Sequence, residues 1–166
     1  MGISKNIFRY FPQPIFHYEL DNYKRHNEEL SKYIYDLQKK DPDGVARSNQ
    51  GGWHSKPFNL KDKENAPFKF FIDIQRYVAD TFKEYGWKYE PRKVNLTEMW
   101  AIINKKNNFN LEHTHPNNYL SAAYYVKAPD NCGSFKVTNP NLISRERITV
   151  SEKNTEFNQN IAQIKP

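Results

Sequence analysis

The pattern of apolar residues changes near Pro91, and this change limits the folds that the chain can adopt. Before Pro91 the apolar residues recur with helical spacing, whereas after it they gather in short segments separated by Asn, Pro and Gly. Five of these segments are predicted strands: 94–104, 110–115, 119–127, 133–138 and 147–150. Two helices ahead of such a run predict an α+β fold, in which the helices support a jelly-roll (double-stranded β-helix) barrel.

The N-terminal segment combines aromatic residues with two prolines. Residues 6–20 are broken by Pro12 and Pro14, which is typical of an edge strand because proline cannot donate to a ladder inside a sheet. Asp21 follows as the predicted N-cap of a helix over 22–39.

A long loop and a second helix complete the first half of the chain. Residues 43–66 lack periodicity and are rich in turn-forming residues, so we expect a loop that carries function, with Trp53 and His54 inside it. Pro67 begins the second predicted helix, which ends near Gly86. Its apolar face consists of Phe70, Phe71, Ile74, Tyr77, Val78 and Phe82.

The length of the chain fits one domain. Domains typically contain about 100 to 150 residues, so residues 1–166 are expected to form a single domain, with the helices and the loop in 1–90 and the first part of the jelly roll in 91–166. Hydrophobic residues make up only 37% of the chain, but the aromatic fraction of 15% supplies large side chains for a core.

Charge and cysteine content exclude several classes of protein. The net charge is +6, but Lys and Arg are interleaved with acidic residues, so a solvated surface is favoured and nucleic-acid binding is a minority hypothesis. Cys132 is the only cysteine, which excludes an internal disulfide. Without a signal peptide or an apolar run of membrane-spanning length, the sequence predicts a cytoplasmic protein with no membrane role.

Two histidines separated by one residue are the candidate metal ligands. In a strand His113 and His115 point to the same face, and Thr114 points to the other. Two imidazoles on one face can share a metal ion. The alternative is a pair of surface histidines before a turn at Pro116, so the neighbouring sequence has to decide between them.

The neighbouring sequence carries a resemblance to a known family. The ordered motifs are Asn110 to Pro116, then Leu120-Ser121-Ala122-Ala123-Tyr124-Tyr125-Val126, then Gly133-Ser134-Phe135 and Asn139-Pro140. This series resembles the 2-oxoglutarate- and Fe(II)-dependent oxygenase superfamily, in its prolyl-hydroxylase-like branch, and looks closest to an uncharacterised subgroup with a His-x-His-Pro motif. The similarity extends over roughly 51–140.

The resemblance implies a set of site residues and cofactors. His113 and His115 would hold Fe(II), and Tyr125, with Ser121 on the same strand face, would contact the cosubstrate 2-oxoglutarate. Trp53 and His54 resemble a loop near the mouth of the site. The implied function is a dioxygenase of the hydroxylase type, whose acceptor substrate the sequence does not identify.

The chain departs from the family pattern at two points. The second ligand is usually Asp or Glu, where this chain has His115, and the third is a histidine on a later strand, whereas no histidine follows His115. We therefore expect the jelly roll and the site to be incomplete, as in a truncated or inactive form. The third ligand would otherwise come from His54, His17, His26 or a partner chain, and a homo-oligomer is compatible with the sequence.

Two other classes of function stay open. A non-catalytic jelly-roll binding module would keep the fold without the chemistry. A cupin-like metal protein also begins its metal site with His-x-His on a strand, but a Glu four to five residues later is then expected, and those positions are Tyr119 and Leu120.

Overall fold

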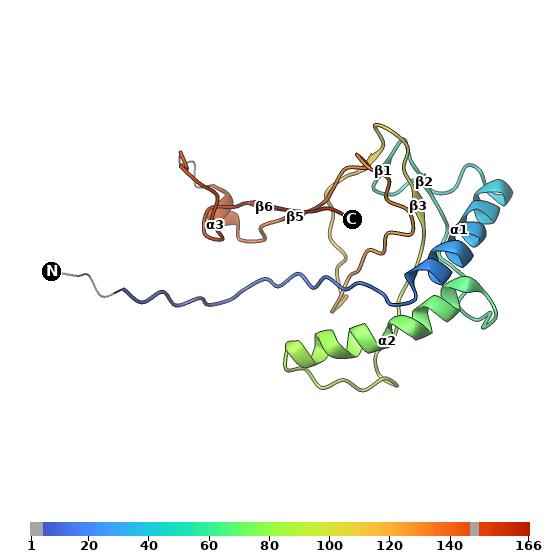
Figure 1. Ribbon diagram of the computed structural model, residues 1–166, viewed down its shortest axis with the longest axis horizontal. Coiled ribbons are helices and arrows are strands. Elements are labelled where there is room, and N and C mark those ends of the chain that lie inside the picture. The colour runs from blue at the N-terminus through green and yellow to red at the C-terminus, as the bar shows by residue number, and fades with distance from the viewer. Residues whose placement is uncertain (1–4, 147–149) are drawn as a thin grey trace. The chain divides into compact units, whose positions relative to one another are not determined.

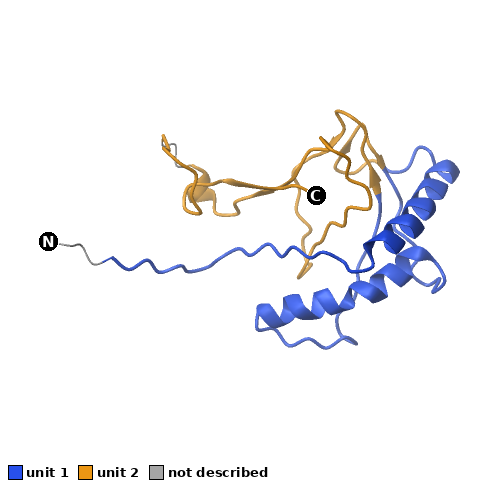
Figure 2. Ribbon diagram, viewed as in Figure 1, with its two compact units in different colours: residues 1–45, 54–101 blue, residues 46–53, 102–166 orange. Residues whose placement is uncertain are grey.

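The computed structural model describes residues 5–146 and 150–166. The chain divides into two compact units (Figure 2). Unit 1 contains the described residues up to Val45 together with His54–Ala101, and unit 2 contains Ala46–Trp53 together with the described residues from Ile102 onward.

Two long helices dominate unit 1 (Figure 1). Helix α1 spans Tyr23–Lys40 and helix α2 spans Ala66–Glu84, so both helices predicted by apolar periodicity are confirmed to within about two residues at each end. The two helices pack against each other, and the most buried side chains of unit 1 include Leu30, Phe70 and Phe82. The predicted apolar face of α2 is buried or half-buried throughout.

The two helix starts differ in how they are capped. Asn65 caps α2, because its side-chain oxygen accepts a hydrogen bond from the backbone N–H of Phe68 at 2.8 Å. The prediction that Asp21 caps α1 is wrong: Asn22 occupies the N-cap position and makes no side-chain cap hydrogen bond. The Asp21 carboxylate instead lies 3.0 Å from the guanidinium of Arg76 on α2, and this opposite charge draws it away from the helix end.

Replacing Asn65 by alanine should lower the free energy of unfolding by about 1 to 2 kcal/mol, because α2 loses its cap. The Asn65 amide also donates to the carbonyl of Asn59 at 2.6 Å, and this bond is lost too. Urea denaturation measures the change. Asn22→Ala is the matched control, since that N-cap side chain makes no cap bond and its removal should cost only a few tenths of a kcal/mol. Equal losses in both variants would contradict the capping role of Asn65.

The N-terminal segment is extended but is not part of a sheet. The described residues before α1 form no strand, so the predicted edge strand over 6–20 is wrong. Its side chains pack on α2 instead: the rings of Phe16 and Tyr85 lie 5.5 Å apart, and Tyr18 donates a hydrogen bond to Asp80 at 2.9 Å. Alternate residues from Phe16 to Leu20 are half-buried, because one face of this extended segment lies against the helix.

The strands of the structure are short and pair two by two. β1 (Asn49–Gln50) is antiparallel to β4 (Phe109–Asn110), with Asn49 opposite Asn110. β5 (Phe135–Thr138) is antiparallel to β6 (Ile161–Ile164), with Thr138 opposite Ile161. The third pair consists of β2 (Trp53–His54) and β3 (Ile102–Ile103).

The predicted strands have mixed outcomes. The segment 133–138 is confirmed as β5. Of the segment 94–104 only β3 is a strand, and of the segment 110–115 only Asn110 is, as the last residue of β4. The segment 119–127 is not a strand, since no other described segment pairs with it and an isolated strand has no ladder to stabilise it. Of the segment 147–150, residues 147–149 lie outside the described residues, and Val150 is not in a strand.

The fold is α+β, as predicted, but a jelly roll is not confirmed. Among the described residues none of the small sheets closes into a barrel. The expectation of an all-β second half also needs correction, because a short helix, α3 (Leu142–Arg145), follows β5. Its N-cap Asn141 accepts a hydrogen bond from the backbone of Ser144, which explains why a turn of helix forms there.

The loop predicted over 43–66 contains two of the short strands. β1 and β2 lie within it, and residues 54–58 run beside 99–101, with the Ser55 N–H bonded to the Ala101 carbonyl at 2.9 Å.

No helix in the described part of the chain combines the length and hydropathy that a bilayer crossing requires.

Candidate metal centre

The candidate ligands His113 and His115 lie just after β4 in unit 2. The ring centroids are 5.0 Å apart and the ring planes differ by 28°, so the side chains lie together. The backbone at both positions is outside any strand, His113 is exposed, and His115 is half-buried. The pair is therefore open to a metal ion from solvent.

A hydrogen bond fixes the tautomer of His113. Its Nδ1 atom lies 2.7 Å from the carbonyl oxygen of Leu111. Because a carbonyl can only accept, Nδ1 carries the proton, and the lone pair of the neutral ring is on Nε2. Metal-binding histidines commonly donate their second ring N–H to such an acceptor, which orients the ring and makes it a stronger ligand.

The two imidazoles fit two of the three protein ligand positions of an iron site, such as the 2-His-1-carboxylate site. The described residues contain no group of three or more His, Cys, Asp or Glu side chains placed to hold a metal ion. The pair supplies two donors, and a third donor is not assembled around it within residues 5–146 and 150–166.

A cluster of hydrogen-bonded side chains at β4 was not predicted from the sequence. It consists of Ser48, Asn104 and Asn110, the last of which belongs to β4. Asn110 accepts a hydrogen bond from the Asn104 amide at 3.0 Å and donates one to the Ser48 hydroxyl at 3.2 Å. The Leu111 N–H donates to the Ser48 carbonyl at 2.8 Å. The frequent asparagines between Asn104 and Asn110 were a visible signal, but the sequence alone does not indicate that Ser48 would meet them.

The predicted cosubstrate residues Tyr125 and Ser121 lie in the extended segment after the pair. Both are exposed, and Tyr125 keeps 42% of its surface accessible. Burial of the remainder raises the pKa of the Tyr125 hydroxyl, and the nearby Cys132 thiolate raises it further. Within the described residues neither side chain is hydrogen-bonded to His113 or His115, so the structure does not bring these four residues into one contact network.

Trp53 and His54 are buried rather than displayed on an open loop. Both belong to β2, and both are less than one tenth exposed. The His54 Nδ1 atom lies 2.6 Å from the Ser55 carbonyl, and its ring stacks on Trp100 with the centroids 5.7 Å apart. Their predicted place near the mouth of the site stays a prediction.

The buried histidine of α1, His26, pairs with a carboxylate. It is only 2% exposed, and its Nε2 atom lies 3.1 Å from the carboxylate of Asp73, which also pairs with Arg25 at 2.7 Å. Arg25 and His26 are on α1 and Asp73 is on α2, so the three lie where the two helices face each other in unit 1. A cavity of about 280 Å³ opens there, lined by Leu20, Asn22, His26, Ile72, Asp73, Arg76 and Tyr77.

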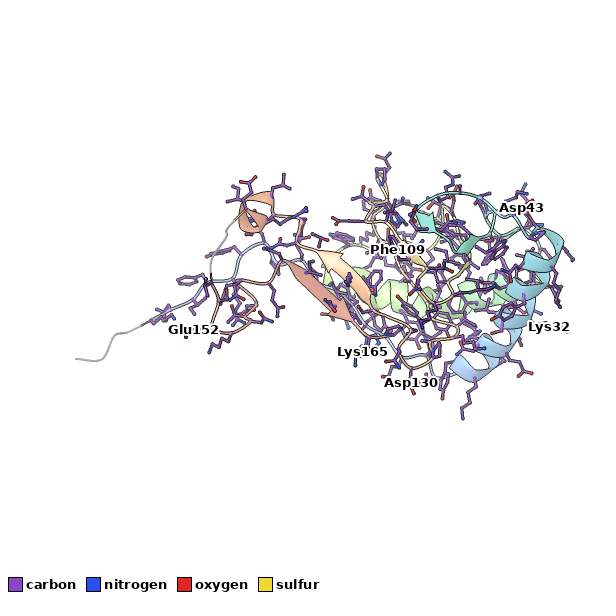
Figure 3. The ribbon with its side chains drawn as sticks, turned by 90° about the horizontal axis from the view of Figure 1, so that it is seen from above. Lys32, Asp43, Phe109, Asp130, Glu152 and Lys165 are labelled. Carbon is purple, nitrogen blue, oxygen red and sulfur yellow. The ribbon has the colours of Figure 1, made fainter. Side chains whose placement is uncertain are left out.

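The surface next to the pair is partly apolar. Phe109 of β4, labelled in Figure 3, is 55% exposed, and Leu111 is 50% exposed. Both of these exposed apolar side chains belong to residues that come just before His113 in the chain.

Comparisons with known proteins give one family match. No curated protein and no solved structure matches the chain. Residues 98–166 match the family described as "Putative 2OG-Fe(II) oxygenase". The matched range begins before the first of the sequence motifs and includes His113, His115, Ser121 and Tyr125. Over residues 98–166, less than half of its length, the chain is therefore similar to the 2OG-Fe(II) oxygenase family.

Proposed function

We propose that the chain is a 2-oxoglutarate- and Fe(II)-dependent dioxygenase of the hydroxylase type, in which His113 and His115 bind the iron. The observation that carries the proposal is the side-by-side arrangement of the two rings, 5.0 Å apart, with Nδ1 of His113 bonded to the Leu111 carbonyl. That bond leaves Nε2 as the donor atom of His113. The family match over 98–166 supports the same reading.

The proposal includes the fold and the extent of the domain. Units 1 and 2 are taken as parts of one oxygenase domain over residues 1–166, and the short strands of unit 2 as the first part of a jelly roll. Two ligands come from the pair, and the described residues place no group of three His, Cys, Asp or Glu side chains there.

Bound iron and 2-oxoglutarate supply the oxidative chemistry: 2-oxoglutarate loses carbon dioxide to become succinate, and one oxygen atom of dioxygen enters a C–H bond of the acceptor while the other enters succinate. The protein's own residues bind and orient. Nε2 of His113 and a ring nitrogen of His115 donate to the metal. The Tyr125 hydroxyl donates to a carboxylate of 2-oxoglutarate, and Ser121 adds a second polar contact.

Production of succinate by the purified chain tests the proposal. With Fe(II), 2-oxoglutarate, ascorbate and oxygen, succinate should form in a reaction that requires the metal, and free imidazole should raise the rate by filling the third ligand position. The Glu152→Ala variant, which removes an exposed carboxylate of unit 2 that is not among the candidate ligands, should keep this activity. Absence of metal-dependent succinate, both with and without imidazole, would overturn the proposed catalysis.

A further inference from the structure

We propose that Ser48, Asn104 and Asn110 form an amide brace that holds His113 in its metal-binding tautomer and orientation. These three are positioning residues, since they act through the backbone of β4 and the segment after it. The inference rests on the proposed function for the role of His113 as a ligand, and it adds the reason why that ring is oriented before any metal binds.

The brace is a continuous series of hydrogen bonds within unit 2. The Asn104 amide donates to Asn110, and the Asn110 amide donates to the Ser48 hydroxyl, at 3.0 and 3.2 Å. The Ser48 carbonyl accepts from the Leu111 N–H at 2.8 Å, and the Leu111 carbonyl accepts from Nδ1 of His113 at 2.7 Å. The position of the Leu111 carbonyl therefore depends on the side chain of the residue before it, Asn110.

Gly52 makes room for the brace. A Cβ atom at this position would overlap the side-chain oxygen of Asn104 and would lie 3.2 Å from the carbonyl of Ile103. The Gly52 carbonyl also accepts from the Asn49 amide at 2.7 Å, so the turn before β2 is tied to β1. Any larger residue at position 52 must displace Asn104 and break its bond to Asn110.

The brace matters because an unrestrained imidazole must be ordered when it binds a metal. A ring whose Nδ1–H already has a fixed acceptor presents Nε2 without rotating and without changing tautomer. Loss of such an outer partner typically costs about 10- to 100-fold in metal affinity. The expected effect of breaking the brace therefore lies in that range.

Substitutions of Asn110 test the inference. Asn110→Leu keeps the size of the side chain but removes both of its hydrogen bonds, and should weaken Co(II) binding by about 10- to 100-fold. Asn110→Asp keeps both bonds, because one carboxylate oxygen accepts from Asn104 and the other from the Ser48 hydroxyl, and should restore the affinity. The matched control is Asn158→Leu, since Asn158 also makes two hydrogen bonds, to Thr155 and Lys153, in a part of unit 2 not linked to the brace.

A second readout needs no metal. Long-range ¹H–¹⁵N correlation spectra of the metal-free protein should show the Nδ1–H tautomer of His113 in the wild type and in Asn110→Asp, and a mixture of tautomers in Asn110→Leu. Gly52→Ala should resemble Asn110→Leu in both measurements, and it provides the test if Asn110→Leu does not fold.

The failures of the two proposals are distinguishable. Wild-type Co(II) affinity and an unchanged His113 tautomer in folded Asn110→Leu would overturn the brace, and so would an Asn110→Asp variant as weak as Asn110→Leu. Equal metal affinity of the wild type and His113→Ala would instead overturn the assignment of His113 as a ligand, and the tautomer spectra would still decide whether the brace exists.

Discussion

His113→Ala is expected to reduce the affinity of the chain for Mn(II) or Fe(II) by more than about 100-fold, beyond the usual cost of losing an outer-shell partner. The variant removes one of only two donors that the described residues bring together, and a single remaining imidazole cannot chelate. Titration calorimetry under anaerobic conditions measures the change. The fold should persist, because His113 is exposed and its removal opens no cavity in the core.

Two controls make this result specific. Glu152→Ala removes an exposed carboxylate of unit 2 that is not among the candidate ligands, and should bind metal like the wild type. The wild-type affinity should also fall as the pH drops through the range in which imidazoles gain a proton, because only the neutral ring donates to a metal. Unchanged binding by His113→Ala, or an affinity that does not vary with pH, would contradict histidine ligation.

The second large effect is on stability. Phe82→Ala should lower the free energy of unfolding by about 3 to 5 kcal/mol, since it removes a buried ring and leaves a cavity. Phe82 is 7% exposed on α2, and its ring makes edge-to-face contacts with Trp87 and Tyr89 at centroid distances of 5.5 and 5.4 Å. Trp87 and Tyr89 lie on the same short segment after the helix, so few other contacts can replace the ones that they lose with the ring.

Ile72→Ala is the matched control for Phe82→Ala. Ile72 lies on the same helix but is 50% exposed, so its truncation should cost less than about 1.5 kcal/mol. Urea denaturation followed by circular dichroism compares the two variants. Similar losses would mean that the core of unit 1 does not depend on the Phe82 ring. Metal affinity of the folded Phe82→Ala variant should be unchanged, since Phe82 belongs to unit 1 and the pair to unit 2.

The helices were predictable because their causes are local in sequence. Helical spacing of apolar residues marked both α1 and α2, and Pro67 marked the start of α2. The cap of α1 was predicted wrongly because Asp21 had two options, the helix end and the Arg76 guanidinium, and only the three-dimensional structure brings the second within reach. Local patterns give the element, but a distant charge can decide how it ends.

The strands were less predictable because a strand needs a partner. Residues 119–127 have strong β propensity, yet no described segment pairs with them, whereas 161–164 pairs with β5. For the site, the rings of His113 and His115 lie together, but strand alternation is not the reason, because neither residue is in a strand. The amide brace could not be predicted, because it joins Ser48 to residues about sixty positions later in the sequence.

The pairing of β5 with β6 has a consequence for the order in which the chain folds. Thr138 and Ile161 are neighbours in the ladder, although the whole segment 139–160 lies between them. Closing a loop has an entropic cost that rises by about 0.6 kcal/mol for each doubling of its length, and the ladder returns few contacts until the loop has closed. The turns of α1 and α2, in contrast, form from residues four positions apart. The turns of each helix should therefore form early, and the β5–β6 ribbon should form later.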